Sequence, residues 1–200
     1  DVVFERFFDE SGGMQLIAHA PFGGRINRAL GLLLRKRFCT SFDFELQAAA
    51  SDDSIVLSLG PQHSFPLEDL KNFLGTKKVH EALIQALLPT PMFQVRWRWN
   101  LNRALLVLRF KKGNRNPPQV QRMESDDLMV AIFPALAQCQ DNATGPREIP
   151  DHPIVRQTLH DCLNEAMDEP ALFELLERIG RGDVRLHFRD TTEPSVLSHE

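Results

Sequence analysis

Acidic residues are missing from two long stretches of this 200-residue chain. None lies between Glu10 and Asp43, and none lies between Glu81 and Glu124. The formal net charge is -4, so positive charge is segregated on this chain and not general. Segregated basic stretches are typical of a surface that faces a polyanion, while the acidic C-terminal part would face solvent or another domain.

Long apolar runs and common catalytic signatures are also absent. No run approaches the roughly 20 apolar residues that a membrane-spanning helix needs. The sequence has no Walker A, GxSxG or HExxH motif, so nothing argues for catalysis by this chain alone. Cys39, Cys139 and Cys162 are odd in number and form no CxxC pair, which predicts reduced thiols in a cytoplasmic protein. Because the chain opens with Asp1 and not Met, we expect a piece of a longer protein.

Hydrophobic periodicity predicts an α+β fold, with short strands and a β-hairpin packed with several helices and a largely helical C-terminal half. Strands are expected at 2–8, 14–20, 42–50, 55–60 and 184–189, with the hairpin turn at 51–54. Helices are expected at 25–38, 67–74, 79–88, 92–108, 125–138, 152–167 and 170–179. The segment 111–118 is rich in Gly, Asn and Pro, so it is predicted to be a loop and the place of any internal boundary.

The second acid-free stretch contains the run Arg96-Trp97-Arg98-Trp99-Asn100. On the predicted helix 92–108, one face is expected to pack inward; it carries Trp97, Leu101, Ala104, Leu105 and Leu108. A different face carries Arg96, Trp99, Asn100 and Arg103. Arginines bind phosphates and an indole stacks on a base, so this face predicts contact with a single strand. The alternative is a solvated arginine face with Trp99 packed against a neighbouring element.

The first acid-free stretch contains a glycine turn, 21–24, followed by Arg25 and Arg28. Free backbone N–H groups at a helix start, beside two arginines one turn apart, would hold a phosphate. The segment matches neither GxGxxG nor GxxxxGK[ST], so the glycines would alternatively serve only a tight turn. The complete set of predicted nucleic-acid-binding residues is Arg25, Asn27, Arg28, Arg35, Arg96, Trp99, Asn100, Arg103, Lys111 and Lys112.

Three acidic residues, Asp161, Glu165 and Asp168, share one face of a predicted helix. They would suit a divalent cation in a metal-dependent nuclease, but an acidic surface or a set of partners for the arginines explains them more simply. His160, Asp161 and Cys162 do not form a catalytic triad, because consecutive helical residues point about 100° apart. We therefore predict no catalytic and no metal-binding residue.

Nine segments, in chain order, resemble the large helicase-related (Lhr) family; they are 5–16, 21–27, 34–39, 44–50, 91–93, 96–100, 117–119, 151–153 and 161–168. The resemblance covers nearly the whole chain and is to the DEAD/H-associated region, which in that family follows two RecA-like motor domains and a winged-helix domain. It implies that residues 1–200 form an accessory domain of a superfamily 2 helicase. Such helicases use ATP to move 3′ to 5′ on single-stranded DNA and to unwind duplexes, including RNA:DNA hybrids, with a role in DNA repair. The motor motifs are absent here, so ATP and Mg²⁺ are expected only for the whole helicase.

Two functions remain open at this stage. In the first, the domain helps to form the nucleic-acid channel and braces the motor; its partners are then single-stranded DNA or an RNA:DNA hybrid, and the RecA-like and winged-helix domains. In the second, it is an internal scaffold or protein-docking domain without nucleic-acid contact. Arg96, Trp99 and Arg103 would then be buried against another domain.

Overall fold

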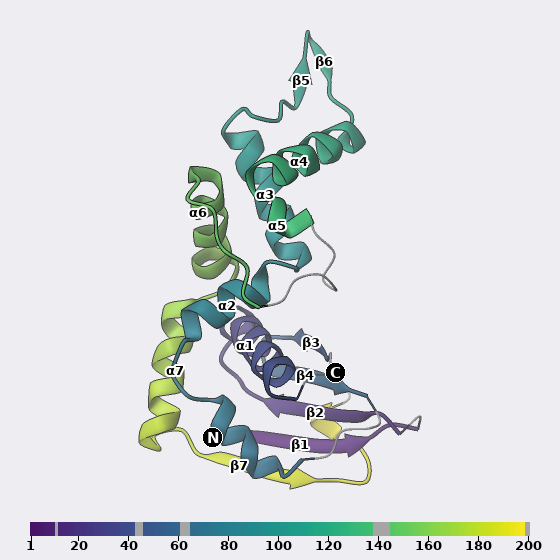
Figure 1. Cartoon of the computed structure of the whole chain (residues 1–200). Helices are drawn as coiled ribbons and strands as arrows, with labels where there is room; N and C mark the ends of the chain where they lie inside the picture. The colour runs from purple at the N-terminus through teal and green to yellow at the C-terminus, as the bar shows by residue number, and fades with distance from the viewer. Residues whose placement is uncertain (11, 43–45, 61–64, 138–144, 199–200) are drawn as a thin grey trace. The chain divides into compact units, whose positions relative to one another are not determined.

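The computed structural model describes residues 1–10, 12–42, 46–60, 65–137 and 145–198. The chain divides into two compact units, residues 1–86 with 166–200 and residues 87–165. Helices combine with short strands in the first unit and dominate the second, which confirms the α+β class (Figure 1). The predicted boundary segment 111–118 lies inside the second unit.

The first unit is built on a five-stranded sheet in the order β3-β4-β2-β1-β7. The strands are β1 (Val2–Phe8), β2 (Met14–His19), β3 (Gln47–Ala50), β4 (Ser54–Leu59) and β7 (Leu186–Asp190). β1 and β7 are parallel, and every other neighbouring pair is antiparallel. The predicted strands 2–8 and 14–20 and the predicted hairpin turn at 51–54 are therefore confirmed.

Helix α1 (Gly24–Phe42) packs against β3, β4 and helix α7 (Glu169–Arg181). Its buried stripe includes Leu30, Leu33, Leu34 and Phe38. A Cβ atom at Gly31 would lie 3.2 Å from Cγ2 of Ile55, so glycine allows the helix to approach the sheet closely. The unit also contains η1 (Leu67–Phe73), α2 (Val79–Leu87) and η4 (Val196–Ser198). Because α1 continues to Phe42, the strand predicted from residue 42 begins only at β3; residues 43–45 lie outside the described part.

The second unit consists mainly of helices α3 (Pro91–Arg103), α4 (Pro118–Ile132), α5 (Pro134–Ala137) and α6 (Pro153–His160). The π-helix η3 (Asp161–Ala166) continues α6, and strands β5 (Phe110–Lys111) and β6 (Asn114–Arg115) form a hairpin. Its core includes the fully buried side chains of Phe93, Trp97, Leu101 and Phe133. Nε1 of Trp97 donates a hydrogen bond to the backbone oxygen of Ser125 at 3.0 Å, which ties α3 to α4.

The predicted end of the tryptophan helix at residue 108 is wrong, because α3 ends at Arg103. Leu105 has a φ of 57°, and the N–H groups of Leu105 and Leu106 bond back to the oxygens of Asn102 and Leu101. This pattern is a Schellman motif, which ends helices and here uses leucine where glycine is usual. Leu105, expected to pack inward, is 72% exposed.

Three further predictions in the second unit are wrong in their boundaries. The segment 111–118 contains the β5–β6 hairpin, and α4 begins at Pro118, not at Ser125. Ser125 is buried inside α4, and its Oγ donates to the oxygen of Gln121 at 2.6 Å. Proline at the first helical position explains the earlier start, since its missing N–H costs nothing there. The regular helix predicted to residue 167 changes to the π-helix η3 at Asp161.

A buried carboxylate, Glu5 on β1, connects the C-terminal segment to the sheet. Its side chain accepts hydrogen bonds from N and Oγ of Ser195, both at 2.7 Å, and from Oγ of Ser198 at 3.1 Å. Nε2 of His19 lies 3.0 Å from the same carboxylate. Burial raises the pKa of Glu5, but the bonds from Ser195, His19 and Ser198 outweigh it and lower the pKa from 4.5 to about 2.

We expect Glu5→Gln to destabilise the first unit at neutral pH by up to about 3 kcal/mol, because the charged form of Glu5 is the form that the folded state favours. Since the folded pKa is depressed, this stabilisation is complete above pH 4.5 and is lost as the pH falls toward about 2. Urea unfolding of both proteins at a series of pH values measures the difference. Glu10→Gln, at an exposed position, is the control. A wild-type advantage that is equal at pH 7 and pH 2 would contradict this assignment.

Candidate nucleic-acid interface

Helix α3 carries Arg96, Trp99 and Arg103 on its outer side, where Trp99 and Arg103 are exposed and the Arg96 side chain is 17% exposed. Thr90 caps the helix by accepting a hydrogen bond from the N–H of Phe93, and Pro91 occupies its first position. This start places Trp97 in the core. The helical period then places the three outer residues on another face, as the spacing predicted.

Trp99 and Arg96 form a stacked pair on this face. Cζ of Arg96 lies 5.0 Å from the centroid of the Trp99 ring, and NH1 of Arg96 donates to Oε2 of Glu165 at 2.7 Å. Trp99 is nevertheless 45% exposed. The indole is therefore held in place by a guanidinium while much of its surface stays open to a flat partner.

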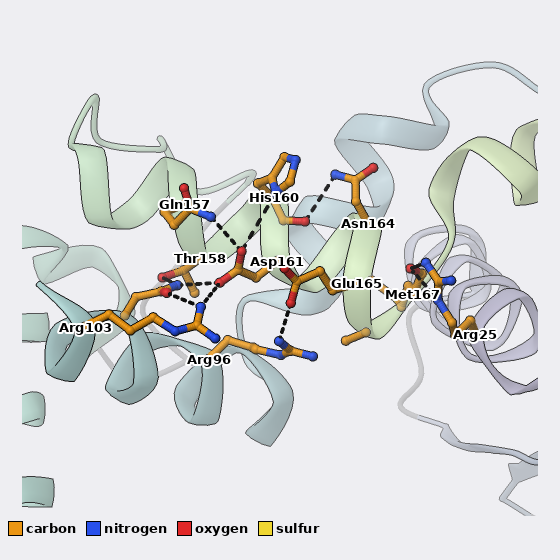
Figure 2. A network of polar contacts seen from close by, with 12 residues as sticks. Arg25, Arg96, Arg103, Gln157, Thr158, His160, Asp161, Asn164, Glu165 and Met167 are labelled. Atoms are coloured by element: carbon orange, nitrogen blue, oxygen red, sulfur yellow. Dashed lines mark hydrogen bonds and ion pairs between the residues drawn. The ribbon is translucent and has the colours of Figure 1, made fainter.

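The centre of the polar network is the fully buried carboxylate of Asp161 (Figure 2). It accepts hydrogen bonds from Nδ2 of Asn100 at 2.9 Å and from Nε2 of Gln157 at 2.7 Å. NH1 of Arg103 lies 3.4 Å from the same carboxylate, and the Arg103 side chain is 59% exposed. Nδ2 of Asn100 also donates to Oγ1 of Thr158 at 3.2 Å. The network fixes Arg103 at the surface by one end, and a guanidinium has further N–H groups that can bind a phosphate.

The predicted residues on α1 take part in a different set of contacts, within the first unit. NH2 of Arg25 donates to the oxygen of Met167 at 3.0 Å, and NH1 of Arg28 donates to the oxygen of Ala166 at 2.6 Å. The buried Nδ2 of Asn27 donates to the oxygens of Ala20, Ser51 and Asp52 at 2.7, 3.1 and 2.9 Å, respectively. Arg35 is partly buried on the same helix.

The start of α1 is already occupied by a carboxylate. Oδ1 of Asp52 accepts a hydrogen bond from the N–H of Gly24 at 2.8 Å. Because an acidic side chain fills the place where a phosphate was expected, this helix start does not support the predicted phosphate site. Asp52 lies far from Gly24 in sequence, so no local pattern indicated the contact.

The last two predicted residues lie on the β5–β6 hairpin. Lys111 forms an ion pair with Glu124 of α4, and Lys112 is exposed at the turn. The second unit thus contains Arg96, Trp99, Asn100, Arg103, Lys111 and Lys112, and the first contains Arg25, Asn27, Arg28 and Arg35. Asn27 and Asn100 are buried and hydrogen-bonded inside the fold, so we leave them out of the candidate surface.

The family model described as DEAD/H associated matches residues 1–198. The chain belongs to this family. It is 30% identical to the Lhr helicase/uracil glycosylase of Escherichia coli over 98% of its own length, and 24% identical to the ATP-dependent helicase Lhr-Core of Saccharolobus solfataricus over 99%. The solved structure of Mycobacterium smegmatis helicase Lhr bound to ssDNA and AMP-PNP matches 98% of the chain with a TM-score of 0.80 and 28% identity.

This DEAD/H associated domain spans only part of each relative. It covers 12% of the Escherichia coli protein, 21% of the Saccharolobus solfataricus protein and 23% of the Mycobacterium smegmatis chain. The expected resemblance to the Lhr family is confirmed. Within the described part of the domain, no helix is long and apolar enough to cross a membrane.

Asp161, Glu165 and Asp168, the three acidic residues of the predicted helix face, each lie beside an arginine in this DEAD/H associated domain. Glu165 pairs with Arg96, and Oδ2 of Asp168 lies 3.5 Å from NH2 of Arg25. Asp168 also caps α7 by accepting from the N–H of Ala171 at 3.2 Å. In the described ranges, no three His, Cys, Asp or Glu side chains are placed to hold a metal ion. Of the two simpler interpretations, an acidic surface or a set of arginine partners, these ion pairs agree with the second.

Cys162 is an unsuitable nucleophile. Burial raises the pKa of its thiol to about 12, so the thiol stays protonated at neutral pH. Phe110 and Arg115 are not in the predicted binding set, although the hairpin places them opposite each other. The sequence does contain a signature of this hairpin, because Lys112-Gly113 suits a two-residue turn between short strands.

We expect Asp161→Asn to destabilise the second unit by about 2–4 kcal/mol, because the new amide group would face the donors of Asn100 and Gln157. Glu165→Gln removes one negative charge from the ion pair with Arg96 and should lower the free energy of unfolding by only about 0–1 kcal/mol. Urea unfolding measures both. Equal stabilities for the two variants would show that Asp161 does not organise the unit.

Proposed function

We propose that this domain is an accessory part of an ATP-dependent 3′–5′ helicase, where it helps to form the channel for a single strand of DNA, or of an RNA:DNA hybrid, and braces the motor. The contact that we assign to this chain is made by Arg96, Trp99 and Arg103 on α3. ATP and Mg²⁺ would be bound by the RecA-like domains of the longer protein. The observation that carries the proposal is the exposed indole of Trp99, stacked on the Arg96 guanidinium in an acid-free stretch.

The chemistry of this face suits a single strand. Bases stack on aromatic rings with little dependence on sequence, and arginines bind the phosphates between them. The similar Mycobacterium smegmatis helicase was solved with ssDNA bound, and the likeness to it extends over 98% of this chain. Support for a nucleic-acid role is therefore drawn from both the side-chain chemistry and a relative.

The second candidate is a protein-docking role, and exposed apolar side chains favour it. Leu105, Leu106, Met123 and Val130 of the second unit are all exposed. Such residues are often covered by a neighbouring domain in a longer protein. In this case Trp99 would be buried by protein, and the isolated chain would not bind nucleic acid.

We expect the isolated chain to bind a labelled single-stranded oligonucleotide with an affinity that falls as salt increases. Fluorescence anisotropy across a salt series measures it. The triple change Arg96/Trp99/Arg103→Ala should weaken binding strongly, and losing two phosphate contacts should reduce the slope of log K against log salt by about 1.4. Trp99→Ala alone should weaken binding about five- to hundredfold and leave the slope unchanged, because it removes stacking and no charge.

The matched control is Phe173/Arg178/Arg181→Ala on α7, which removes one exposed aromatic and two exposed arginines from the other unit. Circular dichroism checks that each variant is folded. If wild-type protein does not bind at low salt, the channel role fails and the docking role is favoured. If the α7 control weakens binding as much as the α3 triple variant, the effect is one of general charge.

A further inference from the structure

The β5–β6 hairpin has two chemically different faces. Phe110 is paired in register with Arg115, and Lys111 with Asn114. Residues directly opposite each other in a hairpin share a face, and successive residues alternate between faces. Phe110 and Arg115 therefore lie on one face, and Lys111 and Asn114 on the other. Figure 1 shows the hairpin projecting away from α3 and α4 of its own unit.

The Lys111 face is fixed to α4. Lys111 forms an ion pair with Glu124, and Nδ2 of Asn116 donates to the same carboxylate at 3.2 Å. Hydrogen bonding from Lys111 lowers the pKa of Glu124, so the pair stays ionised at neutral pH. Nδ2 of Asn116 also donates to the oxygen of Leu108 at 2.9 Å, and its backbone N–H donates to the oxygen of Arg109 at 2.8 Å. These bonds hold the base of the hairpin, and the charge of Glu124 is paired with that of Lys111.

The Phe110 face is exposed and cationic. Phe110 is 63% exposed, Arg115 is exposed on the same face, and Lys112 is exposed at the turn next to it. Lys112 and Gly113 have φ values of 49° and 80°, which correspond to the left-handed turn that tightly closes a two-residue hairpin. A rigid turn that exposes an aromatic ring among cations loses little entropy when it binds a flat, anionic partner.

We propose that this face is a second nucleic-acid contact, in which Phe110 stacks on an unpaired base while Arg115 and Lys112 bind the flanking phosphates. The inference deepens the proposed function, because it also requires that the second unit binds a strand, but it concerns a surface separate from α3. The charge on this face favours nucleic acid as the occupant. No acidic residue lies between Glu81 and Glu124 in the sequence, and Glu124 is paired with Lys111.

Photocrosslinking tests the stacking directly. The whole 200-residue chain is mixed with a single-stranded oligonucleotide that contains 5-bromouracil, irradiated, and digested for mass spectrometry. A stacked Phe110 predicts a covalent adduct on that residue. An adduct map from which the hairpin is missing would overturn the proposal.

Anisotropy with two substitutions at the same position gives an independent test. Phe110→Ala and Phe110→Leu should both weaken binding about five- to hundredfold, since only an aromatic ring stacks on a base. Met123→Ala, at an exposed apolar position on α4, is the control and should bind as wild type does. Full affinity in Phe110→Leu would overturn base stacking, because an apolar contact of any kind would then suffice.

The two proposals fail in different ways. If Trp99→Ala weakens binding and Phe110→Ala does not, the hairpin contact is overturned and the α3 contact stands. If Phe110→Ala weakens binding and Trp99→Ala does not, the hairpin contact is supported and the α3 assignment fails. If wild-type protein does not bind at low salt, both are overturned.

Discussion

The second unit depends on one buried negative charge. Asp161 has no contact with solvent, and an unpaired carboxylate in that position would cost several kcal/mol. Donors from Asn100, Gln157 and Arg103 compensate for that cost, and they come from both sides of the contact between α3 and α6. The orientation of α3 follows from these bonds. The positions of Arg96, Trp99 and Arg103 on the outer side are therefore consequences of a requirement inside the unit.

Hydrogen bonds inside the fold also explain the arginines of the first acid-free stretch. Arg25 and Arg28 donate to the backbone oxygens of Met167 and Ala166, and Arg37 donates to those of Phe73, Gly75 and Lys77. Carbonyl oxygens carry no formal charge, so a sequence can lack acidic residues and still provide partners for its arginines. A count of acids and bases cannot distinguish these arginines from free ones. Only the fold shows which arginines donate hydrogen bonds to backbone oxygens.

Local patterns predicted those parts of the fold that local chemistry decides. The alternation in β1 and β2, the stripe of α1 and the turn at 51–54 could all be derived from spacing. The end of α3 could not, because Leu105 adopts a left-handed conformation that favours glycine. The cap of α1 could not be predicted from local patterns either, because Asp52 lies in the turn between β3 and β4, far along the chain from Gly24. For the site, spacing placed Arg96, Trp99 and Arg103 on one face, but it did not identify Asn100 as a buried partner of Asp161.

These distinctions favour the second acid-free stretch over the first as the proposed site of nucleic-acid contact. Its two exposed aromatic residues that lie beside guanidinium groups, Trp99 and Phe110, are each held on a braced element, one by Arg96 and Glu165 and the other by Lys111 and Glu124. Glu165 binds the arginine that stacks on Trp99, whereas Glu124 binds Lys111 on the hairpin face opposite Phe110 and so fixes the strand that carries the ring. An aromatic ring fixed in this way can stack on a base without first being ordered, so more of the stacking free energy contributes to affinity. Arg25, Arg28 and Arg37 of α1, in contrast, already donate to the chain's own carbonyls, and a phosphate would have to displace those bonds before it could bind.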